Sequence, residues 1–302
     1  MTKEPAHAGV ERISVLLEDW MPPSRGNWEI VLFVFQWIYP TLASLQWLIK
    51  WYGMGKTSVS NSRLNIPGRI AWMTMELPGM LTLLYIMRTL PARQGIDDLP
   101  WQNKVLAGLF VIHYAYRAVA YPLMAVSMSP VHLLVWAAAV VFQLLNASSL
   151  GGWLAAYGPV TESAWGDDGR AGVLQFVVGI AIFYIGLAGN FFHDEELREI
   201  RRREQRRQDA IRQQGGGKVD KHYRIPTAGL FRYVLYPHYL CEWIEWTGFW
   251  VAAGWGCAPA RAFVVNEVAS MLPRAVRGRA WYMERFGEEK IRRKYAVIPG
   301  LI

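Results

Sequence analysis

The clearest candidate for chemistry in this chain of 302 residues is Glu76, which lies in WMTMELPGM inside a long apolar run. A run of about 20 apolar residues can cross the hydrocarbon core of a membrane. An ionisable side chain at that depth costs at least about 2.5 kcal/mol on insertion scales, which makes it a functional candidate. The structural alternative is a buried glutamate satisfied by a neighbouring helix.

A second group lies in HYAYRAVAY, where Tyr114, Arg117 and Tyr121 are spaced three and four residues apart. That spacing places them on one face of a helix. A phenol stays protonated at neutral pH, so Tyr114 beside a carboxyl could hold or protonate a carbonyl oxygen. Aromatic residues at helical spacing are often packing residues, but the arginine on the same face favours a polar cavity.

A third group begins in YRIPTAGLFRYV and enters the next apolar run, where His238, Glu242 and Glu245 recur at intervals of four and three. Asn190 and Asp194, four residues apart, end the preceding run. Carboxylates and amides suit hydroxyls, and arginine suits phosphate. These residues predict a polar pocket, open to the cytosol, for a ligand with ribose hydroxyls and phosphates.

The elements that must position these side chains are long helices. Hydrophobic residues make up 53% of the chain and cluster in runs separated by short charged pieces, which is typical of a membrane protein. We therefore expect an all-α, polytopic fold. Seven transmembrane segments can be placed, at residues 29–49, 70–91, 104–124, 130–149, 171–192, 229–252 and 257–276.

The charges between these segments predict the orientation. Residues 198–224 carry ten Lys or Arg against four acids, and the tail from Arg274 carries eight against three. The loop after the first segment is also basic, whereas those after the second and fourth are neutral or acidic. Because cytosolic loops are enriched in Lys and Arg, we expect the N-terminus outside and the C-terminus in the cytosol.

No internal repeat or low-complexity linker divides the chain, so residues 1–302 are expected to form a single membrane domain. Residues 1–28 are predicted to be an extracytoplasmic segment and residues 277–302 a cytosolic tail. Residues 193–228 are predicted to be a cytosolic loop that starts as a polar helix and is broken by the triplet Gly215–Gly217. This loop is either solvated or a cover over an anionic ligand.

Several function classes are excluded by what the sequence lacks. Basic cytosolic loops explain the net charge of +8, so nucleic acid is not an expected partner. Cys241 and Cys257 form no CxxC, and the six histidines contain no HxxxH pair, so no metal is expected. The chain has no GxGxxG after a strand, no P-loop and no GxSxG, which argues against soluble dinucleotide folds and serine hydrolases.

Taken together, the motifs resemble those of the steroid 5α-reductase (3-oxo-5α-steroid 4-dehydrogenase) family. The similarity covers about residues 50–302 and looks like that of a bacterial-type homologue of the human type 2 enzyme. Any single piece is weak evidence, but the order, spacing and C-terminal ending are together specific. The pieces are GKTS, AWMTMELP, HYAYRAVAY, GNFFHDEELREIR, YRIPTAGLFRYV, HYLCEWIEW and RAVRGRAWYMERF followed by YAVIPGLI.

The resemblance implies seven membrane helices, NADPH entering from the cytosol and a 3-oxo-Δ4 steroid as substrate. Glu76 and Tyr114 match the catalytic pair that binds and polarises the 3-keto oxygen, while hydride attacks C5 and a proton is added at C4. Substrate-binding positions are matched by Trp72, Tyr121 and Trp246. Cofactor-binding positions are matched by Asn190, Asp194, Arg201, Tyr223, Arg224, His238, Glu242, Arg274 and Tyr282.

One residue and two short stretches depart from the family pattern. His238 stands where the human-like sequences have Asn. The region after the third segment reads PLMAVSMSP and lacks the Asn and the Arg-Gly-Arg-Pro run of those sequences. The run Arg277-Gly278-Arg279 replaces a His-rich stretch. Some cofactor contacts must therefore be lost or supplied by other residues.

Two rival readings stay open. The PHYLCE segment also resembles isoprenylcysteine-type membrane methyltransferases, which use S-adenosylmethionine, and sterol reductases of the lamin-B-receptor type share the C-terminal segment. A non-catalytic lipid-binding or transport protein would bind lipid without turnover, but the inverted repeats that favour a transporter are not evident. The sequence leaves open the physiological substrate, the oligomeric state and the membrane, which is the bacterial inner membrane or the endoplasmic reticulum according to the source.

Overall fold

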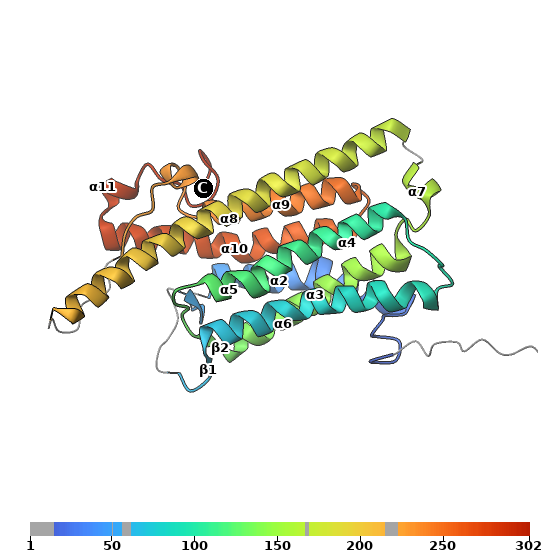
Figure 1. The fold of residues 1–302 in the computed structure, drawn as a ribbon, viewed down its shortest axis with the longest axis horizontal. Helices are drawn as coiled ribbons and strands as arrows, with labels where there is room; N and C mark the ends of the chain where they lie inside the picture. The colour runs from blue at the N-terminus through green and yellow to red at the C-terminus, as the bar shows by residue number, and fades with distance from the viewer. Residues whose placement is uncertain (1–14, 50, 56–61, 167–168, 215–222) are drawn as a thin grey trace, which may run out of the picture.

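The computed structural model describes residues 15–49, 51–55, 62–166, 169–214 and 223–302, and long helices that run side by side dominate it (Figure 1). The chain enters the bundle through an unbroken helical run. This run consists of α1 (Arg25–Phe33), the π-helical η1 (Val34–Ile38), α2 (Tyr39–Ser44) and the 3₁₀-helical η2 (Leu45–Trp47).

The next long helices along the chain are α3, α4 and α6. Helix α3 (Gly68–Arg93) carries Glu76 and passes through Pro78 without interruption. Helix α4 (Trp101–Tyr114) continues through the π-helical η4 (Ala115–Ala120) into α5 (Tyr121–Met124), and α6 (Leu133–Gly152) continues into η5 (Trp153–Tyr157). A short antiparallel pair, β1 (Asn65–Ile66) and β2 (Val131–His132), joins the chain just before α3 to the start of α6, with Asn65 opposite His132.

The C-terminal half is built on α8 and α9. After the short α7 (Glu162–Gly166), α8 (Gly169–Gln213) forms one helix whose C-terminal part projects beyond the bundle (Figure 1). The chain then passes through η6 (Gly229–Arg232) into α9 (Pro237–Ala253), α10 (Ala258–Phe286) and α11 (Glu288–Ile291). Gly254 and Gly287, both with φ of 89°, follow α9 and α10 and end them, because this region of φ is open mainly to glycine.

The helices fall where the apolar runs predicted them, with one shifted start. The sixth segment was predicted to begin at residue 229, but α9 begins at Pro237, which lies in the first helical turn, where proline is tolerated. The preceding residues start with Gly229 at φ 55° and form a 3₁₀ turn instead. The predicted cytosolic loop 193–228 is helical up to Gln213, and its triplet Gly215–Gly217 lies outside the described residues.

Four helical runs of the described chain are long and apolar enough to cross a membrane, at Arg25–Trp47, Gly68–Arg93, Leu133–Tyr157 and Gly172–Gln213. They carry large apolar side chains that are exposed, such as Leu42, Leu134 and Ile185, as expected of surfaces that face lipid. A multi-pass membrane protein follows from these helices. The count of seven spans and the orientation stay predictions.

Helices α8 and α9 pack with their backbones in close approach. A Cβ atom at Gly179, Gly186 or Gly248 would lie 2.3 Å from the backbone nitrogen of Ala252, Glu245 or Phe183, respectively. Only a residue without a side chain fits at these three points. The close packing places Asn190 and Asp194 of α8 beside Glu242 of α9.

Candidate active site

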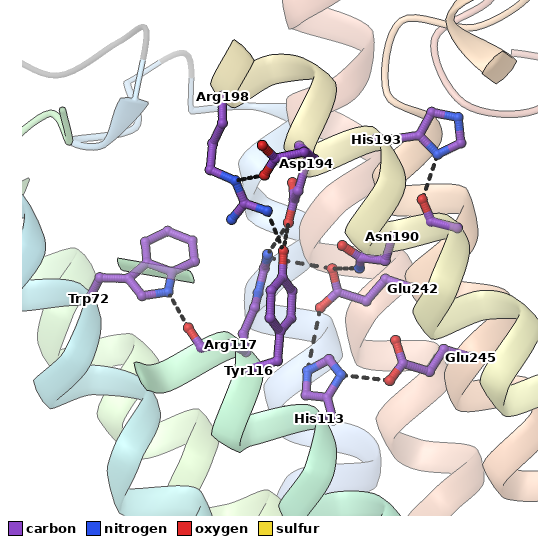
Figure 2. Close-up of polar contacts among 12 residues, drawn as sticks. Trp72, His113, Tyr116, Arg117, Asn190, His193, Asp194, Arg198, Glu242 and Glu245 are labelled. Carbon is purple, nitrogen blue, oxygen red and sulfur yellow. Dashed lines mark hydrogen bonds and ion pairs between the residues drawn. The ribbon is translucent and has the colours of Figure 1, made fainter. Parts of the chain in front are cut away.

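The guanidinium of Arg117 is the centre of a buried polar cluster formed by η4, α8 and α9. It pairs with Asp194 at 3.5 Å and with Glu242 at 3.4 Å (Figure 2). Its carbon Cζ lies 5.1 Å from the ring centre of Trp72 and 5.3 Å from that of Tyr121. A buried arginine between two carboxylates and two aromatic faces is both charge-compensated and held in place.

His113 extends the cluster toward the interior. Its Nδ1 lies 2.7 Å from Glu245 Oε1, and its Nε2 lies 3.9 Å from Glu242 Oε1. Asn190 donates from its amide to Glu242 Oε2 at 3.2 Å. Three parts of the chain that are distant in sequence therefore meet here, because His113 and Arg117 lie on the continuous α4 and η4, Asn190 on α8 and both glutamates on α9.

Tyr116 and Arg198 extend the cluster in the opposite direction. The Tyr116 hydroxyl donates to Asp194 Oδ2 at 3.4 Å and accepts from Arg198 Nη2 at 3.1 Å. Arg198 is itself bonded to Glu195 at 2.8 Å. We call the whole row, from Glu245 to Glu195, the polar chain. It consists of Glu245, His113, Glu242, Asn190, Arg117, Asp194, Tyr116, Arg198 and Glu195.

Some buried polar atoms along the polar chain have no hydrogen-bond partner among the described residues. They are Asn190 Oδ1, Arg198 Nη1 and Glu245 Oε2. Leaving such atoms unpaired in a folded protein costs about 1–3 kcal/mol each. Unpaired buried groups of this kind mark a place where a ligand or water completes the bonding.

Glu76 lies in a second, adjoining cluster with Gln143 of α6. The Gln143 amide donates to Glu76 Oε2 at 2.5 Å. The buried phenol of Tyr114 interacts electrostatically with Glu76 and with the Gln143 side chain. Glu76 also interacts electrostatically with Arg117 and Glu242 of the polar chain, so the two clusters are connected.

An aromatic wall stands beside Tyr114. Its ring centre is 4.5 Å from Phe110, 4.9 Å from His113 and 6.3 Å from Trp246. Trp246 is fully buried, and its ring nitrogen has no hydrogen-bond partner among the described residues. The ring of Phe263 from α10 lies 4.2 Å from Trp246 and closes the wall on the other side.

Residues 129–302 match the family model described as 3-oxo-5-alpha-steroid 4-dehydrogenase. The chain belongs to this family. It is 37% identical over 260 residues to an uncharacterized protein of Schizosaccharomyces pombe, covering 82% of this chain and 89% of that protein. It is 31% identical over 277 residues to steroid 5-alpha-reductase DET2 of Solanum lycopersicum (90% and 95%) and 29% identical over 247 residues to 3-oxo-5-alpha-steroid 4-dehydrogenase 1 of Homo sapiens (82% and 85%).

Membership in the steroid 5α-reductase family makes the chain an oxidoreductase and confirms the family predicted from the motifs. At the family level, the reaction is reduction of a steroid 4-ene. The most similar of these three relatives is uncharacterized, so it adds no substrate.

Several predicted site residues of this steroid 5α-reductase homologue come together in the two clusters. Asn190, Asp194 and Glu242 belong to the polar chain. Trp72 and Tyr121 flank Arg117, and the Trp72 ring nitrogen donates to the Arg117 carbonyl at 3.0 Å. Two further predicted site residues, Glu76 and Trp246, lie around the predicted Tyr114.

Two other predicted cofactor residues, Arg274 and His238, are not members of the polar chain and lie around Tyr239. Arg274 stacks on Tyr239 at 5.7 Å, and the His238 ring lies 4.7 Å from the same tyrosine. Tyr239 in turn interacts electrostatically with Arg117 and Glu242, which connects this group to the polar chain.

Three of the last four predicted residues are linked through Tyr282, which interacts electrostatically with Arg201. Tyr223 and Tyr282 both contact the ring of Trp281, at 5.3 and 5.2 Å, and burial raises the pKa of Tyr282 to about 12. Arg201 donates to the carbonyl of Ser127 at 3.4 Å. Arg224 is exposed.

Eight residues in or beside the two clusters were given no catalytic, substrate-binding or cofactor-binding role from the sequence: His113, Tyr116, Arg117, Gln143, Glu195, Arg198, Glu245 and Glu267. Glu267 interacts electrostatically with Glu76 and Glu242. His113, Glu245 and Glu267 could have been found from the sequence, because each is an ionisable group inside an apolar run and is for that reason a candidate functional residue. Gln143 gave no such signal, since a neutral amide in an apolar run does not stand out by charge.

Proposed function

We propose that the chain reduces the Δ4 double bond of a 3-oxo-Δ4 steroid to the 5α-3-oxosteroid with NADPH as the hydride donor. The observation that carries this proposal is the cluster of Glu76, Gln143 and Tyr114, which gathers hydrogen-bonding groups at one point beside the aromatic wall. Membership in the steroid 5α-reductase family supports the reaction class.

Glu76 and Tyr114 hold the 3-keto oxygen in this proposal. Negative charge builds on that oxygen as the double bond is reduced at C5, and preorganised donors in a dry site stabilise it. The Tyr114 hydroxyl is such a donor, and Glu76 is one in its neutral form. Gln143 orients the Glu76 carboxyl by donating to Oε2, which leaves the other oxygen for the substrate. The proton added at C4 comes from solvent.

The polar chain has the groups that a dinucleotide needs. The unpaired Asn190 Oδ1 can accept from a ribose hydroxyl, and the unpaired Arg198 Nη1 can donate to a phosphate or a hydroxyl. NADPH, when bound, supplies a hydride. Asn190, Asp194 and Glu242 hold the cofactor in this proposal. The remaining proposed contacts are Arg201, Tyr223, Arg224, His238, Arg274 and Tyr282.

The aromatic residues shape the substrate side. Trp246 forms the wall next to Tyr114, and Trp72 and Tyr121 close the space around Arg117. Flat apolar rings suit a flat, apolar steroid, which reaches such a site from the lipid phase. Seven spans, with the cofactor side toward the cytosol, complete this proposal.

The test is turnover by the purified protein in detergent. NADPH oxidation is measured with a panel of 3-oxo-Δ4 steroids, including testosterone and progesterone, and the configuration at C5 of each product is determined. The proposal expects NADPH-dependent formation of 5α products. Methyl transfer from S-adenosylmethionine without NADPH oxidation would instead identify a methyltransferase, and lipid binding without either reaction a transport or binding protein.

A further inference from the structure

His193 of α8 uses both of its ring nitrogens in hydrogen bonds to backbone groups. It is buried, and Nδ1 lies 2.6 Å from the carbonyl oxygen of Gly189, so Nδ1 carries the hydrogen and donates (Figure 2). Nε2 is then the unprotonated nitrogen, and it accepts from the backbone N–H of Leu230 at 3.1 Å. The imidazole thus joins α8 to η6, 37 residues further along the chain.

The sulfur of Cys241 also lies 3.8 Å from His193 Nδ1. A cysteine beside a histidine can form a nucleophilic pair. Here Nδ1 already donates to Gly189 and cannot take a proton from the thiol. His193 is therefore a connector between backbone segments and not a general base.

Contacts on η6 support the same connection independently. Gly229 has φ of 55°, and a Cβ atom there would lie 2.9 Å from His193 Nε2 and 2.7 Å from the Phe192 ring. The ring of Phe231 packs on the imidazole at 5.4 Å. The turn lies so close to α8 that only glycine fits at position 229.

The other side of the turn is fixed by the C-terminal segment. Lys294 donates from Nζ to the carbonyl of Phe231. Tyr295 donates its backbone N–H to Tyr233 at 2.8 Å and accepts from Leu235 at 2.9 Å. The turn η6 and the residues that follow it are thus held on one side by Lys294 and Tyr295 and attached to α8 on the other side by His193.

We propose that His193 is a positioning residue for the cofactor, which fixes the segment bearing Tyr223 and Arg224 relative to Asn190 and Asp194. This inference rests on the proposed function. Asn190 and Asp194 flank His193 on α8, and Arg224 lies six residues before Leu230, the residue that His193 holds. One dinucleotide can contact both groups only if their separation is fixed. Removing the imidazole therefore weakens cofactor binding and leaves Glu76 and Tyr114 undisturbed.

The first test compares His193→Ala with His193→Gln. Glutamine has one donor and one acceptor and can replace both hydrogen bonds. We expect His193→Ala to raise the KM for NADPH about five- to thirtyfold, as the loss of two hydrogen bonds predicts, with kcat little changed. His193→Gln should recover most of this loss. His132→Ala, which removes a histidine that caps α6 through Leu134, serves as the control. A fall in kcat without a change in KM, or a Gln variant as impaired as the Ala variant, would overturn the assignment.

The second test does not depend on turnover. Amide hydrogen exchange, followed by mass spectrometry, is measured on peptides covering residues 223–236 and, for reference, on α3. His193→Ala and Gly229→Ala should both speed exchange in residues 223–236 and leave α3 unchanged. If they do so in a protein that reduces no steroid, the proposed function fails and the attachment by His193 stands. Unchanged exchange in His193→Ala overturns the attachment whatever the activity.

Discussion

The amide nitrogen of Gln143 lies 2.5 Å from a carboxyl oxygen of Glu76, although the two residues are 67 positions apart. This contact joins α6 to α3 at the point where the proposed catalytic carboxyl sits. Gly79, one turn after Glu76, makes room for it, because a Cβ there would lie 2.2 Å from Gln143 Oε1. Gln143 is therefore the residue that sets the direction of the Glu76 side chain.

Replacing Gln143 with Leu should lower kcat about tenfold to hundredfold. Leucine is similar in size to glutamine but cannot donate a hydrogen bond, so the Glu76 carboxyl loses the contact that orients it. The KM for NADPH should not change. Steady-state kinetics with a saturating steroid measure both constants. Gln175→Leu is the matched control, since Gln175 donates to the Val251 carbonyl at 3.0 Å, away from the site. Equal effects of the two replacements would contradict the proposed role of Gln143.

Glu76→Gln and Tyr114→Phe should each lower turnover about a hundredfold to a thousandfold, which is the typical effect of removing one donor to a developing oxyanion. Both proteins should still bind NADPH, because neither residue belongs to the polar chain. Binding is measured by the fluorescence of the nicotinamide, and turnover by steroid product. Wild-type turnover in both variants would show that the catalytic pair is wrongly assigned.

Arg117→Met should destabilise the fold by about 3–5 kcal/mol, since it leaves Asp194 and Glu242 buried without their counter-charge. Thermal unfolding in detergent measures the loss. The control is Arg203→Met, which removes an exposed pair with Glu199 on the projecting part of α8 and should cost no more than about 0.5 kcal/mol. Adding Asp194→Asn and Glu242→Gln to Arg117→Met should restore part of the stability. A triple variant less stable than Arg117→Met would argue against charge imbalance as the cause.

Arg224→Ala should raise the KM for NADPH about tenfold and leave kcat nearly unchanged, because an exposed arginine that pairs with phosphate contributes binding alone. The comparison is Arg212→Ala, another exposed arginine, near the end of α8. The salt dependence of the KM gives a second measurement, since it should weaken in Arg224→Ala only. If the KM for NADPH is the same in the wild type and in Arg224→Ala, Arg224 does not belong to the cofactor site.

The helical positions could be predicted from sequence because burial in lipid requires long apolar runs, and such runs are visible without an alignment. The starting point of α9 could not, since the apolar pattern continues through η6 and only the backbone at Gly229 and the proline at 237 divide them. The polar helix at the start of residues 193–228 was visible from its composition, whereas its length up to Gln213 was not.

The candidate site was visible where charge marked it. Arg117, Asp194 and Glu242 are ionisable groups in or at the end of apolar runs, and the structure gathers them within 3.5 Å contacts. The pairing of His113 with Glu245 bridges 132 positions, and helical spacing within one segment says nothing about such partners. Gln143 was missed for a different reason, because its role comes from the carboxyl it orients and not from its own charge.

The three glycines between α8 and α9 have a consequence for evolution and engineering. Gly179, Gly186 and Gly248 touch no proposed ligand, yet any methyl group added there must push the two helix backbones apart. That separation would widen the gap between Asn190 and Glu242, which bond at 3.2 Å. A mutational scan should therefore find that these three glycines tolerate substitution as poorly as the reacting residues do. Attempts to alter the substrate range should leave the contact between α8 and α9 unchanged.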